Sequence, residues 1–370
     1  MQAGPFRSPG WWAGLGLAIL VSLVAGVAAK SIGETVLGFA RSPISAIMMA
    51  IVIGMIVANT IALPGTIQNG LRFCASTILR IGIMLLGIRL SLLGAGRFTV
   101  VALPFVVVAI AIGLTTVRFL GRRLSLSRQL SGLIAVGTSI CGCTAIVATA
   151  PLIGAKDAEV SYAVACITLF GLAAMFIYPV LGHSIFADQP ALAGLFLGTS
   201  IHETAQVAGA GMMYEAQYNA PVALDIATVT KLVRNLCMIA VIPLVGILYG
   251  EAQSQNMQGS KPKWWTMVPW FIIGFAMMSA LRTVGDLGDR AFGFLDASQW
   301  DAMIGIIRAM AERCLLIAMA AVGLTSMFAG IRQIGLRPFA LGLFAAVLIG
   351  SVSLGQISVF ARPLILAVGL

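Results

Sequence analysis

The chain has 370 residues, of which 59% are hydrophobic and 10% are charged, whereas soluble domains have about 25% charged residues. Its mean hydropathy is +1.01. These values exclude a soluble globular protein and predict an all-α polytopic membrane protein with short loops. The net charge of +10 would favour a nucleic-acid partner in a soluble protein, but in a membrane protein basic residues gather in the loops that fix topology. We therefore expect no nucleic-acid partner.

About eleven apolar runs are long enough to cross a bilayer as helices. In chain order, they cover residues 12 to 29, 43 to 58, 71 to 92, 99 to 119, 129 to 149, 158 to 181, 191 to 213, 222 to 249, 264 to 281, 314 to 331 and 338 to 360. The first run resembles a signal peptide, but Ala28, Ala29 and Lys30 make a poor cleavage site, so we expect a retained first span. The polar segment before the tenth run regains helical spacing after Ser298, and we expect that part to lie along the membrane surface.

Basic residues are concentrated on one side of the predicted topology, and the cluster from Arg118 to Arg128 is the strongest signal. By the positive-inside rule, this cluster places the N-terminus in the cytoplasm and the C-terminus outside. The six cysteines all fall inside apolar runs, and we interpret them as small buried hydrophobic residues without disulfides. Cys141 and Cys143 lack the spacing of a metal site, so we expect neither a metal nor a cofactor.

Three of the predicted spans combine glycine with hydroxyl residues at mid-membrane depth. The candidate site residues in these stretches are Thr138, Ser139, Thr199, Ser200, Thr325 and Ser326. Small residues there allow two helices to pack closely, with hydroxyl groups bonding across the contact. Alternatively, the helices are discontinuous, and their exposed amides and carbonyls bind a substrate or a coupling ion. Both interpretations stay open on the residues alone.

An ionisable pair, His202 and Glu203, lies near the middle of the span 191 to 213. A charge at the centre of a bilayer costs roughly 2.5 to 3.5 kcal/mol, so an intramembrane carboxylate indicates a functional site. On a continuous helix, four polar residues would share one stripe: Thr199, His202, Glu203 and Gln206.

The next span carries a matching polar face, which consists of Lys231, Arg234 and Asn235. We expect the two faces to meet. In one interpretation, Glu203 forms an ion pair with Lys231 or Arg234 that only fixes helix packing. In the other, the excess of positive charge, to which Arg80 adds, forms an anion site, because arginine suits the oxygens of sulfate, sulfite or carboxylate. Arg89, on the opposite face of the span from Arg80, is interpreted as a snorkelling anchor.

His202 and Glu203 also begin like the helix motif of zinc proteases, but Gln206 stands where the second histidine is required. No serine has a credible base apart from His202, and no nucleotide-binding glycine loop occurs. We therefore do not expect an enzyme. His202 is interpreted either as a proton-coupling group, since imidazole titrates near physiological pH, or as a structural residue.

Two short similarities suggest an internal repeat. Gly-Thr-Ser-Ile occurs at residues 137 to 140 and again at 198 to 201, and Ser76 to Arg80 resembles Thr230 to Arg234. If the spans after the first form two repeats of five helices, the odd number makes the halves inverted. The predicted organisation is a single membrane domain with an extra N-terminal span at 1–35 and repeats at 36–185 and 186–370.

Several blocks of sequence together resemble the YeiH-type sulfate exporter family of bacterial inner-membrane proteins. The blocks are residues 82–92, 139–151, 198–207, 231–235 and 318–324. The resemblance implies a place among the cation/proton antiporters and bile-acid-type symporters, which have inverted five-helix repeats and two crossed, discontinuous helices. By position, the crossed pair would be the spans 129 to 149 and 314 to 331. The family's sulfate label is itself an inference, so it supports an anion more than it supports sulfate.

We therefore expect a secondary transporter, an exporter of a small anion such as sulfate or sulfite, that works by alternating access. Lys231 and Arg234 would attract the anion, hydroxyls and amides of the broken helices would coordinate it, and Glu203 with His202 would carry a coupling proton. A sodium- or proton-coupled transporter of cations or organic anions is the main alternative, and an intramembrane enzyme is a further one. The expected partners are the anion, the lipid bilayer and a coupling proton or sodium ion, and a homodimer is compatible with the sequence.

Overall fold

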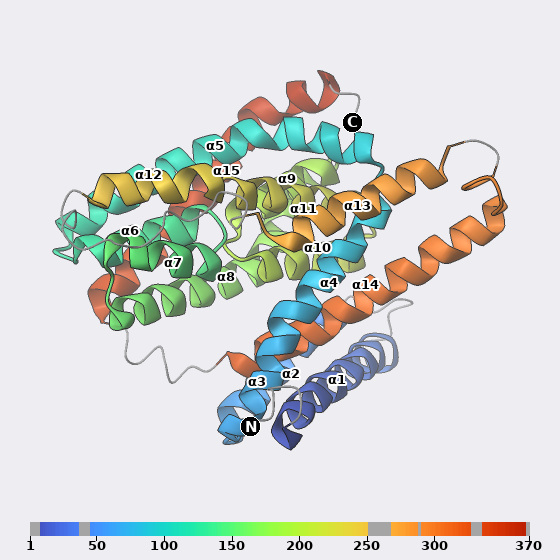
Figure 1. The fold of residues 1–370 in the computed structure, drawn as a ribbon, viewed down its shortest axis with the longest axis horizontal. Helices are drawn as coiled ribbons and strands as arrows, with labels where there is room; N and C mark the ends of the chain where they lie inside the picture. Colours follow the sequence, from blue (N-terminus) through green and yellow to red (C-terminus); the bar gives the residue numbers. More distant parts are fainter. Residues whose placement is uncertain (1–7, 37–44, 251–267, 288–289, 327–334, 368–370) are drawn as a thin grey trace, which may run out of the picture. The chain divides into compact units, whose positions relative to one another are not determined.

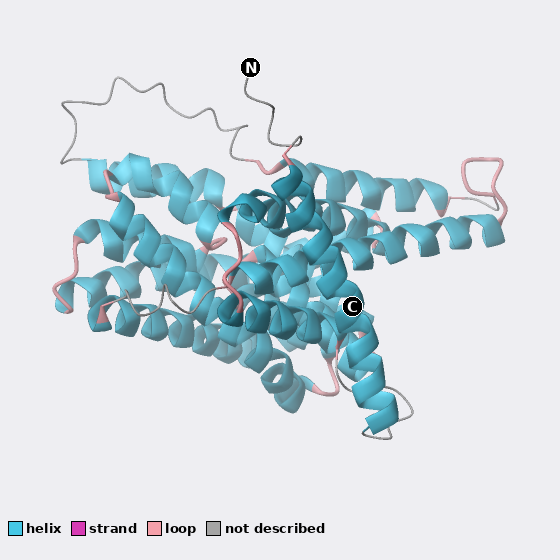
Figure 2. Cartoon of the chain, turned by 90° about the horizontal axis from the view of Figure 1, so that it is seen from below, coloured by secondary structure: helices cyan, strands magenta, loops and turns pink. Residues whose placement is uncertain are grey.

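A computed structural model describes residues 8–36, 45–250, 268–287, 290–326 and 335–367 of the protein. Within these ranges the chain is almost entirely helical, as Figure 2 shows, and the β-type pairing is limited to an isolated bridge between Ala291 and Leu295. Six helical runs in the described part are long and apolar enough to cross a membrane: Pro9–Lys30, Gly65–Arg89, Leu92–Arg123, Asp157–Phe186, Pro221–Tyr249 and Leu336–Leu364. Shorter apolar helices cover Ala46–Thr60, Cys143–Ile153, Pro190–Ser200 and Trp270–Gly285. The prediction of an all-α membrane protein is confirmed.

The described helices divide into two compact units (Figure 1). The first unit consists of Met1–Ala95, Met212–Pro221 and Trp270–Phe328. Its helices are α1 (Pro9–Lys30), α2 (Ala46–Thr60), α3 (Gln68–Phe73), α4 (Leu79–Leu86), α13 (Trp270–Gly285) and α14 (Ala297–Thr325). α14 packs along α2 and α4, while α1 packs on α2 and α3. Small residues such as Ala18, Ala50 and Ala320 are fully buried in the core that these helices share, which allows close helix packing.

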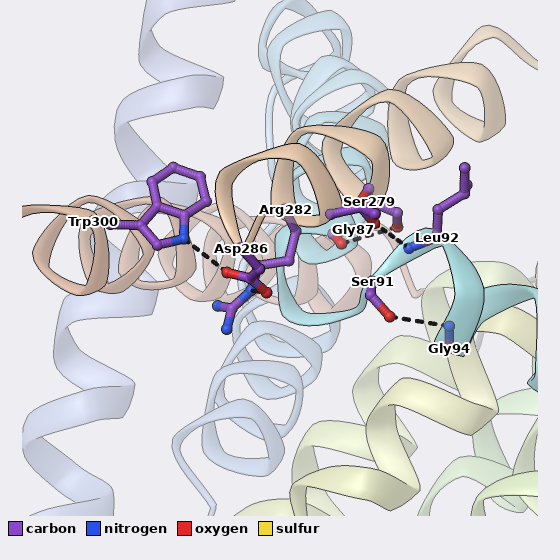
Figure 3. Close-up of polar contacts among 9 residues, drawn as sticks. Gly87, Ser91, Leu92, Gly94, Ser279, Arg282, Asp286 and Trp300 are labelled. Atoms are coloured by element: carbon purple, nitrogen blue, oxygen red, sulfur yellow. Dashed lines mark hydrogen bonds and ion pairs between the residues drawn. The ribbon is translucent and has the colours of Figure 1, made fainter. Parts of the chain in front are cut away.

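Polar contacts tie α13 to its neighbours within this unit (Figure 3). Ser279 of α13 donates a hydrogen bond to the carbonyl oxygen of Gly87, just after α4, at 3.0 Å. Near the end of α13, Asp286 accepts hydrogen bonds from Arg282 at 2.6 Å and from the indole of Trp300 on α14 at 2.8 Å. These contacts fix how α4, α13 and α14 meet.

α14 confirms the helical spacing predicted after Ser298 and joins this segment to the predicted tenth span in one helix. The helix runs for 29 residues without interruption and includes the start of the predicted tenth span. Asp296 caps it, since its side chain accepts from the amide of Gln299 at 2.8 Å and Gln299 returns the contact to the Asp296 amide at 3.2 Å. No stop signal interrupts the apolar spacing after this capping box, so one helix forms.

The second unit consists of Gly96–Gly211, Val222–Pro269 and Ala329–Leu370. Its helices include α5 (Leu92–Arg123), α6 (Arg128–Ser139), α7 (Cys143–Thr149), α8 (Asp157–Phe186), α9 (Pro190–Ser200), α10 (Thr204–Tyr218), α11 (Pro221–Leu236), α12 (Met238–Gly250) and α15 (Leu336–Ala367), although α5, α10 and α11 begin or end in the first unit. α8 packs on α6, α7, α9 and α15, and α15 also packs on α6 and α9.

Two predicted spans of this unit are interrupted. The span 129 to 149 breaks between α6 and α7, and the span 191 to 213 breaks between α9 and α10, which confirms the discontinuous-helix interpretation for both. The span 222 to 249 forms one apolar helical run, Pro221–Tyr249, as predicted, with Cys237 as a turn residue between α11 and α12. The remaining candidate, 314 to 331, is an unbroken part of α14 up to Thr325, and residues 327–331 lie outside the described part.

Candidate functional site

The two Gly-Thr-Ser-Ile stretches fold in the same way. α6 ends at Ser139 and α9 ends at Ser200, so an isoleucine follows each helix as its C-cap. Thr138 donates to the carbonyl of Ile134 at 2.7 Å, and Thr199 donates to that of Leu195 at 2.8 Å. The repeated motif is therefore a repeated helix end, and its threonine hydroxyls face their own helices.

Lys231 of α11 joins the two helix ends. Its side chain is fully buried, and Nζ donates hydrogen bonds to the carbonyl oxygens of Ile140 at 2.9 Å, Ile201 at 3.0 Å, and His202. An ammonium group has three donors, so these three carbonyls use all of them. Lys231 thus satisfies carbonyls that both interrupted helices leave free.

Arg234, about one turn further along α11, makes a parallel set of contacts. Nε donates to the carbonyl oxygen of Ser139 at 2.7 Å, and Nη1 donates to those of Thr199 at 2.7 Å and Ile201 at 3.0 Å. Nη2 donates to the carbonyl oxygen of Thr138. The C-terminal ends of helices carry partial negative charge, which favours cations there. Main-chain carbonyls therefore receive the donors of both cations.

Glu203 lies at the opposite ends of the interruptions, where α7 and α10 begin. Its Oε1 accepts hydrogen bonds from the Cys143 thiol and, at 3.4 Å, from the hydroxyl of Thr168 on α8. The Gln206 amide links the same parts, accepting from the Glu203 main chain at 3.1 Å and donating to the Thr168 carbonyl at 3.2 Å. The half-buried carboxylate is thus held where helix N-termini favour negative charge.

Gly142 makes this placement of Glu203 feasible. It precedes α7 with a φ of +72°, a conformation that glycine adopts without strain. A β-carbon at position 142 would lie 2.4 Å from Cγ of Glu203, closer than any real contact. The break after α6 therefore needs glycine both for its backbone and for the space that Glu203 occupies.

The predicted single stripe of Thr199, His202, Glu203 and Gln206 is wrong, because the helix breaks at Ile201. Thr199 belongs to α9 and Gln206 to α10. Lys231 and Arg234 nevertheless lie at this break, since they donate hydrogen bonds to its main-chain carbonyls. The ion-pair interpretation is not supported either: among the described residues, no ion pair within 4.0 Å joins Glu203 to Lys231 or Arg234.

Several buried polar atoms around the breaks have no hydrogen-bond partner in the described part of the chain. They are Ser139 Oγ, both ring nitrogens of His202, Thr230 Oγ1 and Asn235 Oδ1. All four residues are at most 2% exposed, and Asn235 uses its amide nitrogen to donate to Thr204 at 3.1 Å. Buried polar groups without partners are costly and are usually satisfied by water or a ligand.

The remaining predicted site residues divide between the two units. Ser200 is buried in the second unit and donates to the carbonyl of Phe196 at 2.5 Å. Arg80, Thr325 and Ser326 belong to the first unit, where both hydroxyls donate to carbonyls of α14, at 2.9 Å from Thr325 and 2.7 Å from Ser326. Their part in a substrate site stays a prediction.

Sequence reasoning missed Cys143 and Thr168, which hold Glu203. Cys143 directly follows Gly142, so a helix start there would have aimed its side chain into the break, but the residue was interpreted only as a small hydrophobic one. It is free of disulfides, as are the other five cysteines, which was expected. Nothing in the sequence around Thr168 distinguishes it from a packing residue of α8.

Arg89 also differs from its prediction. Its side chain is 2% exposed and pairs with Glu215, at 2.9 Å between Nη2 and Oε1, within the first unit. Arg89 is therefore no snorkelling anchor, because its charge is held inside the protein by a carboxylate that follows 126 residues later.

The sequence as a whole is similar to proteins from several bacteria. A family model described as "Conserved hypothetical protein 698" matches residues 14–342. The chain is 32% identical over 333 residues to a UPF0324 membrane protein of Oceanobacillus iheyensis, with 89% of each protein covered. It is 31% identical over 324 residues to one of Bacteroides thetaiotaomicron, covering 86% of this chain and 91% of the relative. It is 30% identical over 306 residues to one of Pseudomonas aeruginosa, covering 80% of each.

Proposed function

We propose that this chain, which belongs to the UPF0324 family of membrane proteins, is a secondary transporter that moves a small anion by alternating access. The observation that carries the proposal is the meeting of two helix interruptions at buried charges, with Lys231 and Arg234 at the carbonyl ends and Glu203 at the amide ends. Broken helices persist at membrane depth only where protein or a water-filled path receives their main-chain groups. Transporters place substrate and coupling-ion sites at such breaks.

The charge balance favours an anion over a cation. A helix end carries about half an elementary charge, so the carbonyl ends of α6 and α9 offset about one of the two positive charges. The amide end of α10 offsets part of the charge of Glu203 in the same way. The remainder is positive. The four residues with unsatisfied buried polar atoms, Ser139, His202, Thr230 and Asn235, offer donors and acceptors for such an anion.

The roles of the cations follow from their contacts. Since Lys231 has used its three donors, it acts on a substrate through its charge and by holding the breaks together. Glu203 is the more exposed group and the one that can gain or lose a proton without breaking the main-chain contacts, so we assign it the coupling role. The exporter direction, sulfate or sulfite as substrate, an inner-membrane location and a cytoplasmic N-terminus are parts of the same proposal.

The experiment is flux of labelled sulfate, sulfite and dicarboxylates in proteoliposomes, with and without a pH gradient. The expected result is anion flux that the gradient drives in the wild type and no longer drives in Glu203→Gln. Asp188→Asn, which changes an exposed acid in the second unit, is the matched control and should leave the flux unchanged. Sodium-dependent flux that needs no anion would contradict the proposal and support a sodium-coupled transporter with Glu203 as cation ligand.

Variants of Cys143 test whether Glu203 has a coupling role or a purely structural one. Cys143→Ala removes the thiol donor to the carboxylate, so the pH dependence of transport should shift. Cys143→Ser keeps a donor and should retain the wild-type pH dependence. An unchanged pH profile in Cys143→Ala would argue that Glu203 does not set the coupling.

The inverted-repeat architecture is a further part of the proposal. The equivalent ends of α6 and α9, each closed by Gly-Thr-Ser-Ile, support a duplicated broken helix. The pair of breaks that meet belongs to the spans 129 to 149 and 191 to 213. The combination with 314 to 331 that the resemblance implied stays a prediction, because the described part of that span ends at Ser326. Accessibility of single cysteines from each side of the membrane tests the topology, since inverted repeats place equivalent helices in opposite orientations across the membrane.

A further inference from the structure

A cavity of about 390 Å³ lies in the second unit among α5, α6 and α12, three helices that Figure 1 places together. Its walls are mainly apolar and include Leu114, Leu244, Val245 and Leu248. Leu244 and Leu248 are 50% and 45% exposed, so the wall made by α12 continues onto the outer surface of the helix. In a membrane protein such a surface contacts lipid chains.

One end of this cavity is lined by cations. Arg118 and Arg122 of α5 contribute to the lining. The guanidinium carbon of Arg118 lies 4.8 Å from the ring centre of Tyr249, and that of Arg128 lies 4.7 Å from the same ring. These cation–π contacts hold two arginine side chains at the same aromatic residue. The cavity therefore combines an apolar wall with a basic end.

The floor of the basic end is shaped by Gly132 on α6. A β-carbon there would lie 2.6 Å from the hydroxyl oxygen of Tyr249, so glycine admits the phenol. That hydroxyl and Nε of Arg118 are both buried and have no hydrogen-bond partner among the described residues. The carboxylate of Glu159, beside the start of α6, is engaged by the hydroxyl of Ser127 and the amide of Lys156. Unused donors thus face the cavity, and no carboxylate is among the described residues that line it.

We propose that this cavity binds an anionic phospholipid, with its phosphate at Arg118 and Arg122 and an acyl chain along α12. Arginine pairs with phosphate oxygens through several N–H groups, and basic pockets between membrane helices recognise such headgroups. A free phosphate ion would leave the apolar wall unfilled, and a neutral lipid headgroup would add no net charge to offset the arginines. The site is separate from the helix breaks, so it does not depend on the proposed transport.

The test uses the purified full-length protein in detergent, to which phosphatidylglycerol, phosphatidylcholine or inorganic phosphate is added. The expected result is a rise of several degrees in melting temperature with phosphatidylglycerol only, because a ligand of the folded state stabilises it. The double variant Arg118→Gln/Arg122→Gln should lose this rise. Arg97→Gln, which changes an exposed arginine near the other end of α5, should keep it.

Equal shifts with the neutral lipid or with inorganic phosphate would overturn the assignment, as would a full shift in the double variant. If the double variant does not fold, native mass spectrometry of the wild type decides. Preferential retention of phosphatidylglycerol over phosphatidylcholine, weakened in Arg122→Gln alone, supports the site. Equal retention of the two lipids contradicts it.

Discussion

Arg234 donates a hydrogen bond from Nε to the main-chain oxygen of Ser139, 2.7 Å away and 95 positions earlier in the sequence. The contact places a buried guanidinium at the end of an interrupted helix, with further carbonyls of α6 and α9 around it. A charged group thereby completes the hydrogen bonding of the main chain. A neutral side chain at position 234 would form weaker hydrogen bonds to the same carbonyls.

Removing this guanidinium should destabilise the protein strongly. Arg234→Ala leaves buried carbonyls of two helices without donors, and losing one partner of a buried charged contact costs about 3–5 kcal/mol. Arg234→Lys keeps the charge but has fewer donors, so we expect a smaller loss. Thermal unfolding in detergent measures both, with Arg97→Ala on the exposed face of α5 as the control. Equal melting temperatures of Arg234→Ala and the control would contradict the contact's importance.

Gly142→Ala tests the geometry of the first break. The alanine would have to adopt the φ of +72° that Gly142 has, and its methyl group would meet Cγ of Glu203 at 2.4 Å. We therefore expect a loss of about 1–3 kcal/mol in the free energy of unfolding, together with a loss of anion flux. Gly26→Ala is the matched control, because a β-carbon there meets nothing within 4 Å. It should be neutral or should stabilise α1 by up to about 1 kcal/mol. A fully active Gly142→Ala would show that Glu203 can move without consequence.

The ion pair of Arg89 and Glu215 should matter more than the exposed pair of Arg282 and Asp286. Glu215→Gln removes the carboxylate from a buried arginine, and we expect a loss of about 1.5–3 kcal/mol. Arg282→Gln breaks a pair whose side chains are 27% and 40% exposed, so the expected loss is at most about 0.5 kcal/mol. Melting temperatures of the two variants compare them directly, and the reverse order would refute the ranking.

The cap of α14 predicts a pH dependence of stability. The pKa of Asp296 lies below its ordinary value of 3.8, because the Gln299 amide and the Ser298 hydroxyl donate to the charged form. A lowered folded-state pKa stabilises the protein above pH 3.8, and this contribution is lost as the pH falls through the folded-state value. Asp296→Asn keeps a cap but does not titrate.

The expected result for this cap is a melting temperature of the wild type above that of Asp296→Asn at neutral pH. The difference should shrink as the pH falls below 3.8. Thermal unfolding of both proteins over this pH range measures the effect. A difference that stays constant would mean that the charge of Asp296 contributes nothing to the cap.

The sequence predicted the all-α class, the family, the breaks in two spans and the approach of Lys231 and Arg234 to the second break. These predictions rest on local signals. Glycine beside hydroxyl residues indicates a break, and a charge in the middle of a span indicates a buried polar site. Two features were predicted wrongly, each for a physical reason. A stripe of side chains assumes a continuous helix, and the break at Ile201 removes that assumption. The partner of a buried cation was sought among side chains, but here the carbonyls of helix ends supply it.

Other features could not be predicted because they depend on tertiary packing. Thr168 meets Glu203 only because α8 packs beside α7. The pairing of Arg89 with Glu215 joins segments that the chain brings together from distant positions. The total of eleven spans, the orientation in the membrane and the boundaries of the repeats remain predictions.

Lys231 and Arg234 lie about one turn apart on a single helix, and each bonds to both interrupted helices. α11 therefore links the two helix ends, and a sliding or rotation of α11 would change its hydrogen bonds to α6 and to α9 at the same time. Neither break can be released alone while both cations stay seated. Any movement that separates α6 from α9 must therefore break hydrogen bonds of Lys231 and Arg234.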